Sequence, residues 1–164
     1  MAKIDIIRNT YGGLEYLHNA LDYVTDYRAL YIGGYGVNPY DTEMAYKQML
    51  YTRQYFNKVS GNPLVHIVIA YNNEVKDLAT AAYYGQRCAQ YFADRFQVLY
   101  CNHMRDEHCC QFHTHIIINA LSFINGNMIT TGYDEMHAYC NYVTAVTGQK
   151  SWFYFDNKAV YNGV

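Results

Sequence analysis

The chain is poor in charged residues. Lys, Arg, Asp and Glu make up only 16% of its 164 residues, and the formal net charge is -2. Because nucleic-acid affinity depends largely on Lys and Arg side chains that neutralise phosphates, this composition argues against an extended phosphate-binding surface. Hydrophobic residues make up 51% of the chain, which excludes an intrinsically disordered protein or a coiled coil. We expect a globular protein that forms a single domain over residues 1–164.

The sequence also lacks paired cysteine spacings and long apolar runs. Its five cysteines, at positions 88, 101, 109, 110 and 140, are odd in number and show no C-x-x-C spacing, which disfavours a disulfide framework or a zinc knuckle. No run approaches the roughly 18 apolar residues that a membrane span requires. These absences predict reduced thiols in a soluble, cytoplasmic protein without membrane insertion.

Tyrosine, by contrast, is abundant, with 20 residues in the chain. Tyr combines a stacking face with a polar tip, which suits a surface that binds nucleic-acid bases but equally suits any half-buried sheet. We expect most of these tyrosines to be scaffold. The sequence does not identify which of them would stack on a base.

Hydrophobic periodicity predicts an α+β fold. Strands are expected at 3–8, 64–71, 96–103 and 112–121, with 29–36 either a strand or a Gly-rich loop and 152–155 a candidate final strand. Helices are expected at 14–25, from Asp41-Thr42 to about residue 57, between 77 and 94, and at 133–147. Because a loop joins 96–103 to 112–121, these strands should pair antiparallel. The prediction is a single, largely antiparallel sheet of about five strands with helices packed on it.

The strand segment Phe112–Asn119 carries two histidines, His113 and His115. Alternate side chains of a strand share one face, so both imidazoles should point the same way, about 7 Å apart along the backbone. A rigid central strand that holds two imidazoles suits a transition-metal ion. A His-x-His pair alone is more often structural, however, and catalytic metal sites usually have three protein ligands.

His103 is the favoured third ligand because it ends the preceding predicted strand, and His108 in the intervening loop is the competing candidate. The other histidines, His18, His66 and His137, stand alone in the sequence and are interpreted as core or surface residues. The sequence has no His-Glu-x-x-His motif, which disfavours a metal hydrolase that acts on a small molecule.

Residues 30–126 resemble the relaxase or mobilisation-nuclease domain of plasmids and integrative elements, within the His-hydrophobe-His endonuclease superfamily. The resemblance runs in order from Leu30-Tyr31-Ile32 and Asn38-Pro39, through an inner strand, an Ala- and Gly-rich helix and the strand that ends at His103, to Phe112–Asn119. It implies site- and strand-specific nicking of single-stranded DNA at a transfer origin, through a covalent 5'-phosphotyrosyl intermediate that initiates conjugative transfer or mobilisation. Accessory transfer proteins and a coupling protein are the implied partners.

The resemblance also implies roles for individual residues. His103, His113 and His115 would hold a divalent metal ion, with Mn²⁺ or Mg²⁺ expected and Zn²⁺, Co²⁺ or Ni²⁺ as alternatives. Tyr31 would attack the scissile phosphate. The further candidates are Tyr35 and Tyr40 as reserve nucleophiles and Asp106, Glu107 and Asn119 as auxiliary residues.

The chain departs from the family pattern at two positions. Asp41-Thr42 stands where the family often has Lys-Thr, and Arg105 stands where an acidic residue often follows the first histidine by two positions. Family members commonly carry C-terminal extensions, so the sequence could be a fragment of a longer protein.

Two other functions remain open. A rolling-circle replication initiator of the same superfamily would have its tyrosine on a helix after the histidine strand, which indicates Tyr139 or Tyr142. A non-catalytic metal- or DNA-binding module with structural histidines is favoured by the negative net charge and the missing Lys at position 41.

Overall fold

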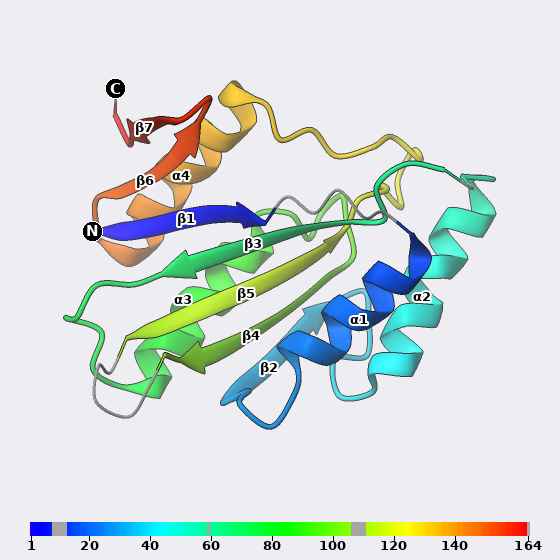
Figure 1. The fold of residues 1–164 in the computed structure, drawn as a ribbon, viewed down its shortest axis with the longest axis horizontal. Helices are drawn as coiled ribbons and strands as arrows, with labels where there is room; N and C mark the ends of the chain where they lie inside the picture. The colour runs from blue at the N-terminus through cyan, green and yellow to red at the C-terminus, as the bar shows by residue number, and fades with distance from the viewer. Residues whose placement is uncertain (8–12, 59, 106–110, 164) are drawn as a thin grey trace.

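The computed structural model describes residues 1–7, 13–58, 60–105 and 111–163. Within these residues the chain forms one seven-stranded sheet and four helices (Figure 1). The strands are β1 (Ala2–Ile7), β2 (Tyr31–Tyr35), β3 (Leu64–Ala70), β4 (Val98–Met104), β5 (Phe112–Asn119), β6 (Ser151–Phe155) and β7 (Lys158–Tyr161). The helices are α1 (Leu14–Val24), α2 (Thr42–Tyr55), α3 (Leu78–Gln90) and α4 (Tyr133–Thr147). The predicted α+β class is confirmed.

The strand order across the sheet is β2-β4-β5-β3-β1-β6-β7. Neighbouring strands pair antiparallel, except that β1 and β6 are parallel. The sheet is therefore largely antiparallel, as expected. β5, which carries the histidine pair, lies between β4 and β3 and is a central strand.

The sheet has seven strands rather than the predicted five or so. The segment 29–36 forms the edge strand β2, and 152–155 falls within β6. The strand missed entirely is β7, which folds back on β6 through Asp156 and Asn157, with φ of 47° and 62°. This is the type I′ hairpin turn, which needs positive φ at both positions, and Asp-Asn is a weaker signal for it than Asn-Gly.

Side-chain caps and a left-handed glycine set the helix boundaries that the sequence indicated. The Asp41 carboxylate accepts a hydrogen bond from the Met44 backbone N–H (2.9 Å) at the start of α2, and Asp77 does the same for Thr80 (2.8 Å) at the start of α3. Gly148 ends α4 with φ of 69°. None of the described helices is long and apolar enough to cross a membrane.

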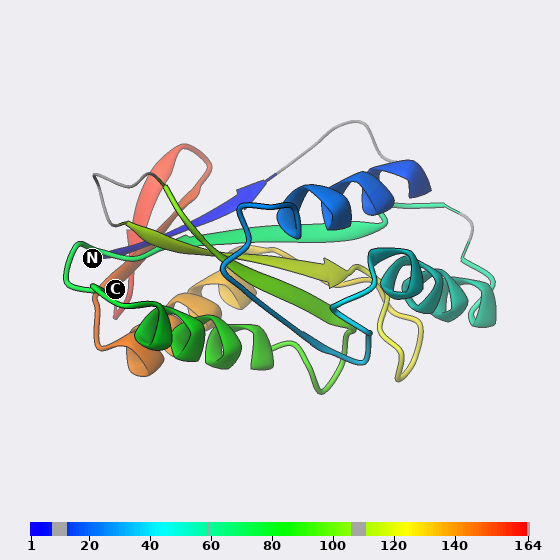
Figure 2. The ribbon, with the colours of Figure 1, turned by 90° about the horizontal axis from the view of Figure 1, so that it is seen from below.

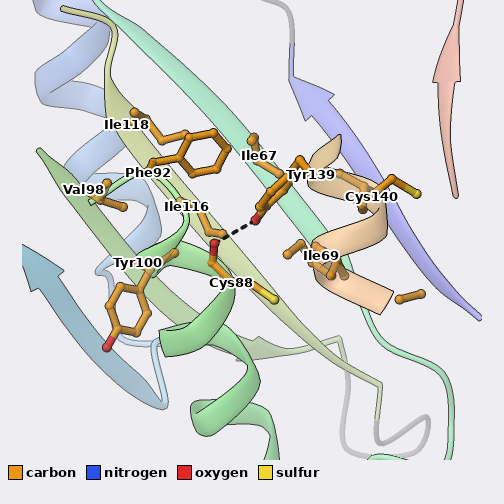
Figure 3. Packing of buried hydrophobic residues seen from close by; sticks show 14 of the residues in the cluster. Ile67, Ile69, Cys88, Phe92, Val98, Tyr100, Ile116, Ile118, Tyr139 and Cys140 are labelled. Carbon is orange, nitrogen blue, oxygen red and sulfur yellow. Dashed lines mark hydrogen bonds between the residues drawn. The ribbon is translucent and has the colours of Figure 1, made fainter. Parts of the chain in front are cut away.

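The helices cover both faces of the sheet (Figure 2). On one face, α3 and α4 pack on the larger core, in which Ile67 of β3 and Ile116 of β5 contact Phe92 and Tyr139 (Figure 3). The Tyr139 hydroxyl donates to the backbone carbonyl of Cys88 (3.2 Å). On the other face, α1 and α2 pack on a smaller cluster over β4 and β5. The histidine face is the one that α1 and α2 cover in part.

The side chain of Thr114 fixes β5 from the α3 face of the sheet. Its hydroxyl lies 2.6 Å from the Tyr71 hydroxyl and accepts a hydrogen bond from the Asn102 side-chain amide (2.8 Å). A Cβ at Gly85 of α3 would lie 2.9 Å from this Thr114 hydroxyl, so the glycine permits the close approach of helix and sheet. The histidines on either side of Thr114 point to the opposite face.

Candidate active site

Strands β4 and β5 bring three histidines together on one face of the sheet. His103 is the direct cross-strand partner of His113, and His115 follows two residues later on the same face. The ring centroids are 4.6 to 5.5 Å apart. Each residue offers one ligand atom, and these atoms all lie within 4.8 Å of one another. Three converging imidazole nitrogens can hold a metal ion and leave a coordination position open.

Hydrogen bonds hold two of the three imidazoles, His103 and His115, each through one ring nitrogen. His103 Nε2 donates to the backbone carbonyl of the last residue of α1 (2.8 Å), and His115 Nδ1 lies 2.9 Å from His66 Nε2. Such hydrogen bonds fix the tautomer and orientation of metal-binding histidines and leave the other ring nitrogen for an ion.

The environment keeps these imidazoles uncharged. Burial lowers the pKa of His103 and of His113, and it lowers the pKa of His115 to about 2. Burial likewise lowers the pKa of His66 to about 4. Neutral imidazoles present free lone pairs at neutral pH, so the residues present fit a divalent ion.

His66 is a member of the site that the sequence interpretation missed. It was interpreted as an isolated core or surface residue, yet it lies on β3 against the His115 ring, with centroids 5.1 Å apart. The pairing of Val68 with His115 sets this neighbourhood, because it places His66 diagonally opposite. The sequence shows a histidine on a predicted inner strand. It does not show the register of that strand on β5, which is what places His66 against His115.

Tyr23, near the C-terminal end of α1, lies beside the histidines. Its ring stands perpendicular to that of His115, with centroids 6.1 Å apart, and its side chain is 52% exposed. Tyr23, His66 and His115 line one pocket of about 310 Å³ together with Val68. A phenol that is open to solvent and adjacent to a candidate metal centre can reach a substrate bound there.

An arginine lies over the Tyr23 ring. The Arg28 guanidinium carbon is 4.8 Å from the ring centroid. Asp26 holds Arg28 in place, accepting from its Nε (2.9 Å) and Nη2 (2.6 Å), and these hydrogen bonds hold the pKa of the Asp26 carboxyl below its usual range. The site therefore has an oriented guanidinium beside the phenol, whose charge the Asp26 carboxylate partly neutralises.

A comparison with known protein families matches residues 16–149 to the family described as Relaxase: MobA/VirD2-like, nuclease domain. The chain belongs to this relaxase family. The relaxase resemblance stated from the sequence is thus confirmed, and membership indicates a nuclease that nicks DNA in mobilisation and binds single-stranded DNA. No curated protein matches the chain.

The relaxase fold does not bring Tyr31 to the histidines. Tyr31 pairs with Asn102, whose side chain faces α3, and its ring lies 6.3 Å from that of Tyr100 on the same face. The Tyr35 hydroxyl donates to the Gln86 carbonyl of α3 (3.3 Å). Both tyrosines therefore lie across the sheet from the candidate metal centre.

The other candidates in the relaxase domain are also remote or lie outside the described residues. Tyr40 is 80% exposed in the segment between β2 and α2, and Asn119 is buried, where its amide donates to the Met49 carbonyl (3.1 Å) and to Gln97 (2.9 Å). Asp106, Glu107 and His108 lie outside the residues that the structure describes. Tyr139 and Tyr142, expected for a replication initiator, bond to the backbone of α3 on the opposite face.

Tyr23 escaped the sequence interpretation because it falls inside a predicted helix. The buried residues of α1 are Leu17, Ala20, Leu21 and Val24, and Tyr23 lies off this apolar stripe. The usable signal was an aromatic residue off the apolar stripe in the last turn of the predicted helix. That helix directly precedes β2, the strand that pairs with the His103 strand β4. Like Tyr31, it precedes an aliphatic residue in the N-terminal part of the matched segment.

Replacing His66 with Ala should weaken metal binding by about 10- to 100-fold, although the three ligand histidines remain. The reason is that His115 Nδ1 loses its partner and the ring loses its fixed orientation. His66→Gln, which keeps a hydrogen-bond acceptor, should retain most of the affinity. Calorimetric titration of Mn²⁺ into the three proteins measures this order, and equal affinity for wild type and His66→Ala would contradict it.

Proposed function

We propose that this relaxase domain nicks one strand of DNA at a transfer origin by attack of Tyr23 on the scissile phosphate. The observation that carries the proposal is the adjacency of the three converging histidine nitrogens and the exposed Tyr23 ring on one face of the sheet. A phosphate bound by a divalent ion that His103, His113 and His115 would hold would lie next to this phenol. Tyr23 therefore replaces Tyr31 as the proposed nucleophile.

The chemistry is a transesterification. The Tyr23 oxygen forms a bond to phosphorus, and the bond from phosphorus to the 3' oxygen breaks. The phenol loses its proton and the departing 3' oxygen gains one, which gives a 5'-phosphotyrosyl link and a free 3'-hydroxyl. Because the phosphodiester energy is kept in this link, attack by a 3'-hydroxyl can rejoin the strand.

The chain's own residues orient this reaction. Arg28, oriented and partly neutralised by Asp26, places guanidinium N–H donors next to Tyr23 and to any phosphate that reaches it. A divalent ion held by the three histidines would act as a Lewis acid toward the non-bridging phosphate oxygens. The all-imidazole ligand set favours a transition-metal ion such as Mn²⁺ over Mg²⁺, which prefers oxygen ligands.

The polarity of the covalent product tests the proposal. The protein is incubated with Mn²⁺ and single-stranded oligonucleotides that have a randomised centre and a label at either the 3' end or the 5' end. On a denaturing gel, the 3' label should migrate with the protein and the 5' label should be released. A chelator should remove the band.

Two results would overturn the proposed function. One is the absence of any covalent band although Mn²⁺ and DNA both bind. The other is a band that carries the 5' label, which would place the protein on the 3' phosphate instead.

A further inference from the structure

A row of paired residues continues from the histidines to the far edge of the sheet. His113 pairs with Ala70 of β3, which pairs with Lys3 of β1. Lys3 pairs with Trp152 of β6, which pairs with Tyr161 of β7. Directly paired residues share a face, so all five side chains lie on the histidine face.

Among the residues that the structure describes, this face is open beyond α1. The side chains of Lys3 and Asp5 are 39% and 36% exposed, although β1 is flanked by β3 and β6. Among the described elements, α1 and α2 lie toward β2 and β4, whereas β1 and β6 carry no helix on this face (Figure 1). Between Lys3 and the histidines, Ala70 forms part of a hollow of about 220 Å³ that Arg105 and His113 also line.

Three aromatic side chains occupy the open end of this face. The Trp152 ring lies 5.1 Å from that of Tyr154 and 6.2 Å from that of Tyr161, between centroids. Tyr154 is 54% exposed and Tyr161 is 43% exposed. We name Trp152, Tyr154 and Tyr161 the aromatic platform.

We propose that the aromatic platform stacks the bases of the single-stranded DNA that runs across the sheet from the histidine site. The inference rests on the proposed function, because it assigns this strand as the occupant. The platform lies outside the matched residues 16–149, so the family match does not account for it.

Single-stranded DNA fits this face better than a duplex does. Exposed aromatic rings stack unpaired bases of any sequence, and such stacking requires little positive charge. Lys3 adds little positive charge to this face, because its Nζ lies 2.9 Å from the Asp5 carboxylate, which partly neutralises it. The same Nζ lies 5.6 Å from the Trp152 ring centroid. This arrangement also agrees with a chain that has few Lys and Arg residues.

The distance suits one continuous strand. Three strand spacings separate β5 from β6, which is about 14 Å at the usual spacing within a sheet. A strand whose scissile phosphate lies at the histidines would therefore place bases on the platform within a few nucleotides. The hollow that the described residues form at Ala70 lies along this path.

Trp152 reports on this site directly, because it is the single tryptophan of the chain. With a Tyr23→Phe protein and no added metal ion, single-stranded oligonucleotides should quench the Trp152 fluorescence, since the assay then measures binding without cleavage. A duplex of the same sequence should quench it less. Unchanged emission at DNA concentrations that saturate binding would overturn the platform.

The variant Tyr154→Ala/Tyr161→Ala should bind single-stranded DNA about 5- to 150-fold more weakly, with the fold checked by circular dichroism. The variant Tyr154→Phe/Tyr161→Phe keeps the rings and should bind as the parent does. Tyr51→Ala/Tyr55→Ala removes two tyrosines of α2 that are more exposed still, and it should have no effect. Equal affinity in the first variant and the parent would overturn the platform.

The two proposals can fail separately. If the Tyr154→Ala/Tyr161→Ala variant with Tyr23 intact forms the adduct at parental DNA concentrations, the platform is wrong and nicking stands. If DNA quenches Trp152 and the alanine variant binds weakly, but Mn²⁺ yields no adduct with the unaltered chain, nicking fails and the platform stands.

Discussion

Replacing Tyr23 with Phe should abolish the covalent protein-DNA adduct, with a loss of at least about 10³-fold in its rate of formation. The variant lacks the one oxygen that is proposed to bond to phosphorus. The ring remains, so its contacts with His115 and Arg28 and the folding of α1 should be retained. Quantifying the adduct on denaturing gels with Mn²⁺ measures the effect.

Tyr31→Phe is the matched comparison. Tyr31 lies across the sheet from the histidines, so its hydroxyl should not affect the rate of adduct formation. If Tyr31→Phe loses the adduct and Tyr23→Phe keeps it, the assignment of the nucleophile is reversed. Both variants should bind single-stranded DNA with parental affinity.

Replacing His113 with Ala should lower the affinity for Mn²⁺ by more than the 10- to 100-fold typical of residues that only support a ligand. One of three converging nitrogens is lost, and the two that remain do not usually hold an ion. Adduct formation should fall in parallel at a fixed Mn²⁺ concentration. Calorimetry measures the affinity, and a labelled oligonucleotide measures the adduct.

His18→Ala is the control for this experiment. His18 lies on α1, where it bonds to Glu43 (3.0 Å) and Asp22 (3.2 Å) rather than to the histidine group. It should bind Mn²⁺ as the wild type does. Should His113→Ala and His115→Ala also bind Mn²⁺ normally, the three histidines would be structural and the catalytic proposal would fail.

The histidine group was predictable because its geometry is local. Strand alternation alone places His113 and His115 on one face, and a short loop between antiparallel neighbours brings His103 opposite His113. Their convergence therefore follows from two strands that are adjacent in the sequence. Metal binding at these residues stays a prediction.

The tyrosine was not predictable in the same way because its position depends on tertiary packing. The register of β2 on β4 pairs Tyr31 with Asn102 rather than with His103, and a shift of one residue would have reversed its face. Tyr23 reaches the histidines because α1 packs its apolar stripe on β4 and β5. His66 likewise depends on how β3 pairs with β5. Neither the two strand registers nor the packing of α1 can be inferred from a local sequence pattern.

Thr114 bears on which ions the site could accept. Its hydroxyl joins the strand between His113 and His115 to Tyr71 and Asn102 on the opposite face, and Gly85 lets α3 close over them. These buried hydrogen bonds hold the strand backbone from which the two imidazoles project. A loop could adapt its ligands to ions of different radius, whereas this strand offers one fixed spacing. Residues that never touch the ion would then limit the range of ion radii that the site accepts.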